Sequence, residues 1–186
     1  MFIIKNNYYL YIENTRSINL NSFKKNKKIS IIYRNNYKSE SLEELCKFKK
    51  NCNKKDFKFY IANNYRLAIN CKSDGLYLSS YNKKLYPKYK INLIGSAHNF
   101  REIYEKERQG CSHIILSRLF KTSYKNKSNF LGIVKFNLLT KNYSTNFISL
   151  GGINNSNLLK VKIVNCIGLG LLSEIKKKPA ISSRLF

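Results

Sequence analysis

Three segments in the second half of the chain combine glycines, hydroxyls and lysines, a composition typical of phosphate-binding loops. A Phe-Lys-Thr-Ser-Tyr-Lys segment supplies Thr122 and Lys125, a later segment carries Gly151 and Gly152, and a Gly-Leu-Gly-Leu-Leu-Ser segment ends in Ser173. Adjacent glycines let backbone N–H groups approach an anion without obstruction by Cβ, and a helix start behind them adds a favourable dipole. A Gly-Gly pair alone is more often an ordinary turn. The prediction of a phosphate site therefore depends on all three segments together.

His98 is the residue best suited to proton transfer. It follows the apolar run Ile91–Gly95 and precedes Asn99, a residue type that commonly begins helices. An imidazole can take up and return a proton near neutral pH. The alternative interpretation is structural: His98 caps the helix that begins at Asn99, or fills a packing gap.

The elements that must position these residues follow one repeated unit, which is a short apolar run, a polar turn, and then a helical or irregular stretch. The runs are nearly continuously apolar, as is typical of parallel strands covered on both faces. Eight strands are predicted: Tyr8–Ile12, Ile29–Tyr33, Phe57–Ala62, Gly75–Leu78, Ile91–Gly95, His113–Leu116, Asn146–Leu150 and Ile167–Leu172.

Helix signals lie between the strands. Ser41 and Glu44 can form a capping box at the start of one helix, and Asn99 can cap another. The predicted helices are Ser41–Asn51, Asn99–Gln109, Gly132–Lys141 and Ser156–Val164. About Tyr65–Ser73 there is room for no more than two turns, and Tyr81–Tyr89 should hold little helix because it contains Pro87. On the Asn99–Gln109 helix a solvated charged face is expected, made of Arg101, Glu102, Glu105, Lys106 and Arg108.

Eight strands with crossovers between them predict an α/β fold, a shortened (β/α)₈ TIM barrel that occupies residues 1–186 as a single domain. Such barrels usually need about 250 residues, and this chain has 186. An open, doubly wound sheet is the main rival because it requires no closure. In a barrel the carboxyl ends of the strands form one mouth, where the loops after strands 7 and 8 commonly bind phosphate. Asp74 precedes a strand and is interpreted as a turn residue.

The composition restricts the classes of protein further. The chain has 35 Lys and Arg against 10 Asp and Glu, a formal charge of +25. Such a charge is expected of a nucleic-acid binder, but heavy use of Lys, Asn, Ile and Tyr also fits AT-rich codon bias. No run of about 18 apolar residues predicts a membrane-spanning helix, and the start does not resemble a signal peptide. Five cysteines without a CxxC pair predict reduced thiols and a cytoplasmic protein that does not act at a membrane.

Several motifs occur together in the order of a known family. They are Gly95-Ser-Ala-His-Asn99, His113-Ile-Ile-Leu-Ser-Arg-Leu-Phe120 with the Thr122 to Lys125 segment, Leu131-Gly132, Ile148-Ser-Leu-Gly-Gly-Ile-Asn154 and Gly168-Leu-Gly-Leu-Leu-Ser173. Upstream, Phe59-Tyr-Ile-Ala-Asn-Asn64, Ser73-Asp-Gly-Leu-Tyr-Leu78 and Ile31-Ile-Tyr-Arg34 continue the pattern more thinly. The chain resembles the thiamine phosphate synthases and their TenI-like thiazole tautomerase branch.

The resemblance implies an enzyme that couples an aminopyrimidine diphosphate to a thiazole phosphate and releases diphosphate. It implies that Arg34 and Lys125 bind phosphate and that Asn63 lies on the diphosphate side. Thr122, Gly152 with Gly151, and Ser173 would bind the thiazole phosphate. His98 would be the proton shuttle of the tautomerase branch. Mg²⁺ is the implied cofactor, the two phosphorylated heterocycles are the implied partners, and a homodimer is compatible with the hypothesis.

The departures from the family pattern concern the metal. Asn64 and Asn82 stand where the family has magnesium-binding Asp residues, and Ile32 and Asn36 replace a Gln and a Lys on strand 2. Neutral amides substitute poorly for carboxylates because Mg²⁺ is a hard cation that favours anionic oxygen. These losses argue against a fully competent synthase. Three hypotheses stay open: a synthase-like transferase, a tautomerase that uses His98, and a non-catalytic, basic nucleic-acid-binding protein.

Overall fold

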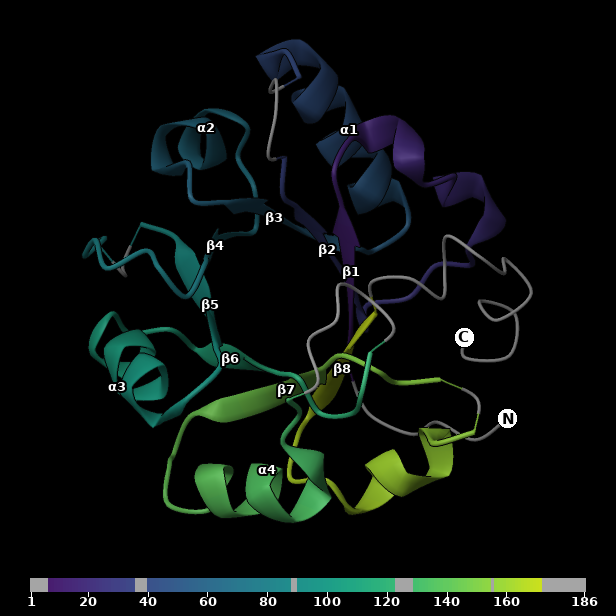
Figure 1. Cartoon of the computed structure of the whole chain (residues 1–186). Coiled ribbons are helices and arrows are strands. Elements are labelled where there is room, and N and C mark those ends of the chain that lie inside the picture. The colour runs from purple at the N-terminus through teal and green to yellow at the C-terminus, as the bar shows by residue number, and fades with distance from the viewer. Residues whose placement is uncertain (1–6, 36–39, 88–89, 123–128, 155, 172–186) are drawn as a thin grey trace.

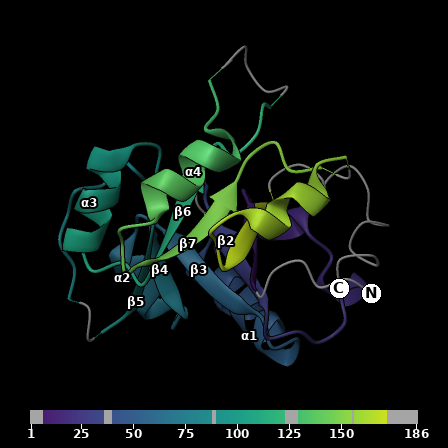
Figure 2. The same cartoon turned by 90° about the horizontal axis from the view of Figure 1, so that it is seen from below.

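The chain forms a closed barrel of eight parallel strands in the sequential order β1 to β8, with β8 pairing with β1. The computed structural model describes residues 7–35, 40–87, 90–122, 129–154 and 156–171. The strands are β1 (Asn7–Ile12), β2 (Ile29–Tyr33), β3 (Lys58–Ala62), β4 (Gly75–Leu78), β5 (Asn92–Ala97), β6 (His113–Ser117), β7 (Asn146–Leu150) and β8 (Gly168–Leu171). Figures 1 and 2 show the helices on the outside of the strands. The predicted TIM barrel is confirmed, and closure excludes the open sheet.

Among the described residues, four α-helices and three 3₁₀ helices lie between the strands. They are η1 (Thr15–Ser17), η2 (Leu20–Ser22), α1 (Leu42–Lys54), α2 (Tyr65–Asn70), α3 (Phe100–Arg108), α4 (Gly132–Thr140) and η3 (Leu158–Ile163). The capping box of Ser41 and Glu44 is present, and the Asn99 side chain accepts a hydrogen bond from the Glu102 amide at 3.0 Å. Between β4 and β5 the described residues form no helix, as Pro87 predicted.

The predicted α-helix Ser156–Val164 is wrong in type, because the segment forms only the 3₁₀ helix η3. Its N-terminal residue Asn157 provides no side-chain cap. The Asn157 side chain is used within the preceding loop, where it accepts from the Asn154 amide at 2.9 Å and donates to the Gly152 carbonyl at 2.7 Å. The first amides of η3 therefore lack the acceptor that an α-helix start requires.

Tyrosines fill the interior of the barrel. Tyr9, Tyr11, Tyr60 and Tyr77 are buried together with isoleucines from β2, β5, β6 and β7. Their size is accommodated by small residues on the neighbouring strands: a Cβ on Gly75 would lie 2.3 Å from the Tyr60 ring. A second, larger apolar cluster lies between the sheet and the helices. Because each strand is buried on both faces, its sequence is nearly continuously apolar.

Asp74 lies at the amino end of β4, where it accepts a hydrogen bond from the Phe59 amide at 2.7 Å and pairs with the Lys49 ammonium. It thus joins β3, β4 and α1 at the end of the barrel opposite the carboxyl ends of the strands.

Across the described residues, no helix is long and apolar enough to span a membrane. Cys52, Cys71 and Cys166 are buried thiols.

The solvated charged face predicted for α3 is wrong at Lys106, which is fully buried. Its side chain crosses Gly95 of β5, where a Cβ would meet the Lys106 Cδ at 2.7 Å. The Lys106 ammonium donates to the Asn82 carbonyl at 2.6 Å and to the Gln109 Oε1 at 2.8 Å. The charge pattern of a helix alone cannot distinguish a lysine that points to solvent from one that passes over a glycine into the protein.

Candidate functional site

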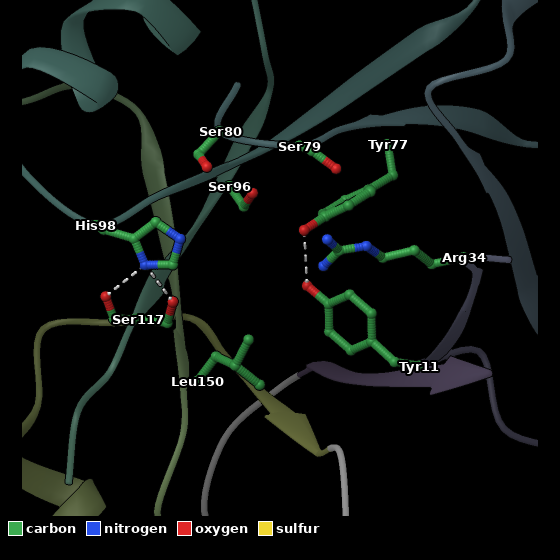
Figure 3. Close-up of a pocket in the computed structure, with 9 residues that line it drawn as sticks. All are labelled: Tyr11, Arg34, Tyr77, Ser79, Ser80, Ser96, His98, Ser117 and Leu150. Carbon is green, nitrogen blue, oxygen red and sulfur yellow. Dashed lines mark hydrogen bonds between the residues drawn. The ribbon is translucent and has the colours of Figure 1, made fainter. Parts of the chain in front are cut away.

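A small cavity of about 90 Å³ opens at the carboxyl ends of the strands. Figure 3 shows the nine residues that line it. They come from β1, β4, β5, β6 and β7 and from the residues that directly follow β2, β4 and β5. The lining residues are Tyr11, Arg34, Tyr77, Ser79, Ser80, Ser96, His98, Ser117 and Leu150. The described lining holds four serine hydroxyls, an imidazole and a guanidinium, and no acidic side chain, so the cavity is suited to an anionic ligand.

His98 directly follows β5 and reaches across to the end of β6. Its Nδ1 lies 2.9 Å from the Ser117 Oγ and 3.1 Å from the Ser117 carbonyl oxygen. A carbonyl oxygen can only accept, so this contact favours the imidazole tautomer that carries its proton on Nδ1. The other ring nitrogen points into the cavity in Figure 3. It is therefore available as a proton acceptor for a bound ligand.

Arg34 follows β2 and points into the cavity beside the tyrosine pair of β1 and β4 (Figure 3). The Tyr11 hydroxyl lies 3.4 Å from the Tyr77 hydroxyl, and the two rings meet edge to face. Burial, and next the neighbouring Tyr77, raise the pKa of Tyr11 well above its usual value of 10.0, so this phenol stays neutral. The Arg34 Nε is buried and has no hydrogen-bond partner among the residues that the structure describes. Such a donor is costly to leave unpaired unless a ligand supplies the acceptor.

Thr122, Gly151 and Gly152 lie beside the cavity rather than in its lining. The loop after β7 packs against the loop after β6, where the Phe120 amide donates to the Gly151 carbonyl at 3.0 Å. At Gly152, φ is +70° and a Cβ would lie 2.4 Å from the Lys121 carbonyl oxygen, so this close approach requires glycine. The Thr122 hydroxyl accepts from the Arg118 guanidinium at 3.2 Å. Because Leu150 lines the cavity, the glycine loop begins at its edge.

Asn63 is brought to the same end of the barrel, but its side chain is occupied. The Asn63 Nδ2 donates to the Ser79 Oγ at 2.8 Å and to the Tyr81 hydroxyl at 3.0 Å, and its Oδ1 accepts from the Ser79 amide at 2.9 Å. A φ of +57° turns its backbone for these contacts. Asn63 therefore holds the loops after β3 and β4 together, and does not line the cavity.

The two asparagines at the magnesium positions also have their oxygens engaged. The Asn64 Oδ1 caps α2 by accepting from the Leu67 amide, and the Asn82 Oδ1 accepts from the Lys84 amide, each at 3.0 Å. In the part of the chain that the structure describes, no group of three His, Cys, Asp or Glu side chains could hold a metal ion. Lys125 and Ser173, the remaining predicted ligands, lie outside the described residues.

Sequence patterns predicted Arg34 and His98 as site residues, but not most of the other residues that line the cavity. Tyr11 and Tyr77 were placed only within predicted strands. Ser96 and Ser117 lie inside the family motifs but were not singled out, and Ser79 and Ser80 belong to no motif. One signal was available: all six lie at or within two residues of the carboxyl end of a predicted strand. In a barrel such positions meet at one mouth, although their common register cannot be obtained from local sequence.

The structure resembles those of several solved proteins. Thiamine phosphate pyrophosphorylase from Pyrococcus furiosus matches with a TM-score of 0.73 and 15% identity, over 98% of this chain and 94% of that one. N-acetylmannosamine-6-phosphate 2-epimerase from Clostridium perfringens matches with a TM-score of 0.62 and 16% identity, over 98% and 93%. At these identities the likeness establishes the fold.

Sequence relatives narrow the family. A thiamine-phosphate synthase of Prochlorococcus marinus is 29% identical over 122 residues, which are 63% of this chain and 35% of that protein. The synthase of a second Prochlorococcus marinus strain is 26% identical over 141 residues, 73% of this chain and 40% of that protein. The chain thus spans between a third and two fifths of the length of these relatives. Residues 20–175 match the TMP-TENI family, described as thiamine monophosphate synthase. Because this match covers most of the chain, the chain belongs to the thiamine monophosphate synthase family.

Proposed function

We propose that this protein acts in thiamine biosynthesis as a transferase. It would bind a phosphorylated thiazole and a pyrimidine diphosphate at the mouth of the barrel. The C–O bond to diphosphate would break, the pair of electrons would leave with the diphosphate, and the thiazole nitrogen would form the new C–N bond. The observation that carries this proposal is the Arg34 guanidinium, whose buried Nε has no partner among the described residues. In that same part of the chain the cavity lining is rich in hydroxyls and holds no carboxylate.

Each group in the cavity has a physical task in this reaction. Negative charge accumulates on the diphosphate as its bond breaks, and a fixed guanidinium stabilises that charge. Serine hydroxyls can donate further hydrogen bonds to phosphate oxygens. The pyrimidine-methyl cation must be kept from water, and the interior tyrosines, Tyr11 and Tyr77, border the cavity on one side. Because burial raises the pKa of Tyr11, its neutral hydroxyl adds no anion that would compete for the cation.

The test uses the purified protein with thiazole phosphate and pyrimidine diphosphate, and measures thiamine phosphate and diphosphate by chromatography. We expect both products in equal amounts. Arg34→Gln should lower kcat/KM by about 10-fold to 100-fold, the value of hydrogen bonds to a charged group. Arg16→Gln is the matched control, because Arg16 is exposed and pairs with Glu44 away from the cavity. Absence of product together with no calorimetric binding of thiazole phosphate would exclude the transferase.

The His98 geometry supports a second candidate, a tautomerase that moves a proton within a thiazole carboxylate phosphate. The Ser117 contacts fix the ring and leave one nitrogen facing the cavity. Incubation with the thiazole carboxylate phosphate in D₂O, followed by NMR, distinguishes the candidates: a tautomerase exchanges the ring proton without any pyrimidine substrate. The nucleic-acid hypothesis stays a separate prediction, namely RNA or DNA affinity that falls steeply with salt.

A further inference from the structure

The Lys106 ammonium lies buried beneath the loop after β4. Its two hydrogen bonds, to the Asn82 carbonyl and the Gln109 Oε1, are to neutral oxygens. The ion pairs formed among the described residues are Arg16 with Glu44 and Lys49 with Asp74, so none of the described carboxylates forms an ion pair with this ammonium. Burial lowers the pKa of Lys106, while Cys111, Glu102 and Glu105 act in the opposite direction. A buried ammonium without an acidic partner makes its surroundings electropositive.

Gln109 acts on the same loop from the end of α3. Its Nε2 donates to the Asn82 carbonyl at 2.9 Å and to the Lys84 carbonyl at 2.8 Å. The Asn82 carbonyl therefore accepts from two α3 side chains at once. Both donors are buried, and Gly95 provides the space that lets the Lys106 stem reach the loop. The result is a clamp, made of Lys106 and Gln109, on residues 82–84.

The clamp is connected to the cavity through Asn82. The Asn82 amide closes a turn onto the Ser79 carbonyl at 2.9 Å, and its Nδ2 donates to the Asn63 Oδ1 at 3.2 Å. Asn63 in turn donates to the Ser79 hydroxyl and accepts from the Ser79 backbone amide. Ser79 and Ser80 are lining residues. Hydrogen bonds therefore connect the Lys106 ammonium to the cavity lining through Asn82, Asn63 and Ser79.

Asn82, a member of this network, stands at one of the two positions where the sequence resemblance places magnesium carboxylates, and Asn64 stands at the other. The Asn64 and Asn82 amide oxygens accept backbone N–H groups, and the Asn82 carbonyl accepts an ammonium. A hard divalent cation requires several free, preferably anionic, oxygens. The donor set around these asparagines therefore does not fit Mg²⁺.

We propose that Lys106 replaces a divalent cation in this protein: it positions the loop after β4 and supplies fixed positive charge beside it, so that the cavity binds the diphosphate end of its ligand without metal. This inference rests on the proposed ligand class, and it names Lys106 as a positioning residue. The loss of the magnesium carboxylates then no longer argues against transferase activity, because Lys106 on α3 supplies the positive charge that the metal would have supplied.

The first test measures metal binding alone. Mn²⁺ is titrated into the wild-type protein and followed by electron paramagnetic resonance. We expect no saturable binding below about 1 mM, the weak end of protein sites for hard divalent cations. A micromolar Mn²⁺ site that depends on Asn64 and Asn82 would overturn the proposal, whether or not the protein forms thiamine phosphate.

The second test measures calorimetric binding of inorganic diphosphate in the presence of EDTA. The wild-type protein should bind it, and Lys106→Met, which keeps an apolar stem over Gly95, should bind it at least 10-fold more weakly. Gln109→Glu should also weaken binding, because a carboxylate beside Lys106 neutralises its charge while the lysine stays in place. Arg108→Met, an exposed position on the same helix, should bind as the wild type does.

The outcomes separate the clamp from the reaction. If diphosphate binds in EDTA with the expected dependence on Lys106 but no thiamine phosphate forms, the clamp stands and the transferase proposal fails. If Lys106→Met and Gln109→Glu both fold, as judged by thermal unfolding, and bind diphosphate like the wild type, the clamp is wrong. Should Lys106→Met not fold, Gln109→Glu and the Mn²⁺ titration decide the question.

Discussion

His98 and Ser117 join the ends of β5 and β6 through two contacts to one ring nitrogen. The His98 Nδ1 lies 2.9 Å from the Ser117 hydroxyl and 3.1 Å from its carbonyl oxygen. The His98 amide is held as well, by the Glu102 Oε2 at 2.8 Å. The imidazole is therefore fixed at both its backbone and its ring, with one nitrogen left for the cavity. A group that must give and take a proton benefits from such fixed geometry.

If His98 transfers a proton, His98→Ala should abolish tautomerisation and leave the Kd for thiazole phosphate within about 10-fold, because the loss of one hydrogen bond costs about 0.5–1.5 kcal/mol. Ser117→Ala keeps the carbonyl contact, so kcat should fall only by about 10-fold. NMR exchange rates give kcat, and calorimetry gives Kd. Unchanged exchange in His98→Ala would return this residue to a structural role.

Two glycines with nearly the same φ angle allow a test of how much the contact between the loops after β6 and β7 contributes to stability. Gly152 has φ of +70° and no space for a Cβ, whereas Gly132 has φ of +68° and open space around it. Gly132→Ala should cost about 1 kcal/mol from backbone strain alone. Gly152→Ala should cost at least about 3 kcal/mol, because the clash with the Lys121 carbonyl adds to the strain.

The readout for this pair is chemical denaturation together with calorimetric titration of thiazole phosphate. Only Gly152→Ala should also weaken ligand binding, since it forces apart the two loops beside the cavity. Equal losses of stability in both variants would mean that the contact between the loops contributes nothing.

Asp74 should stabilise the protein without affecting its ligand. Its carboxylate accepts from the Phe59 amide and pairs with Lys49, whose side chain is only 9% exposed. Asp74→Ala leaves that lysine buried without its partner, and we expect the free energy of unfolding to fall by about 2–3 kcal/mol. In the control, Arg16→Ala removes a pair whose arginine is 84% exposed, and stability should change by no more than about 0.5 kcal/mol.

Because Asp74 lies at the far end of the barrel from the cavity, Asp74→Ala should bind thiazole phosphate with wild-type affinity at temperatures below its unfolding transition. Denaturant titration and calorimetry measure the two quantities. A loss of affinity in the folded variant would contradict its assignment to structure.

His113 predicts a dependence of stability on pH. Burial, and next the nearby Lys58, lower the pKa of His113 below its usual 6.5. The unfolded chain therefore takes up this proton at a higher pH than the folded protein does. Its contribution to stability is complete above about pH 6.5 and is lost as the pH falls through the lowered folded pKa, at a slope of at most about 1.4 kcal/mol per pH unit.

His113→Gln should remove this dependence. The free energy of unfolding, measured by denaturant titration at pH 7 and pH 5, should differ less in the variant than in the wild type. His98→Gln is the control, because the chain contains only these two histidines. An unchanged difference in His113→Gln would show that another group causes the loss of stability in acid.

The fold could be predicted from sequence because its signals are local. A strand buried on both faces reads as a continuous apolar run, so the ends of seven predicted strands lie within one residue of the observed ends, and only Ile91–Gly95 extends two residues further, to Ala97. Ser41 and Asn99 signalled their helices because capping depends on residues within one turn. The Ser156–Val164 segment was the exception, since its capping residue, Asn157, bonds instead to the glycine loop before it.

The site could be predicted only where a side chain directly follows a strand and belongs to a motif, as for Arg34 and His98. Asn63 was correctly placed at the mouth, but its amide is consumed by Ser79, Tyr81 and Asn82, which are 16 to 19 residues away in sequence. No local pattern reports whether such a partner exists. Lys106 shows the same limit. Its charged neighbours in sequence predicted a solvent-exposed side chain, but its neighbours in space bury it.

By itself, the sequence determined the strand order, the helix starts and the end of the barrel at which polar residues gather, because periodicity, capping and glycine content act over a few residues. Only the tertiary structure decided which polar groups are still free to meet a ligand. Hydrogen bonds between segments far apart in the chain engage Asn63 and Asn82 and hold the buried Lys106. The Arg34 Nε, in contrast, is buried without a partner in the described part of the chain.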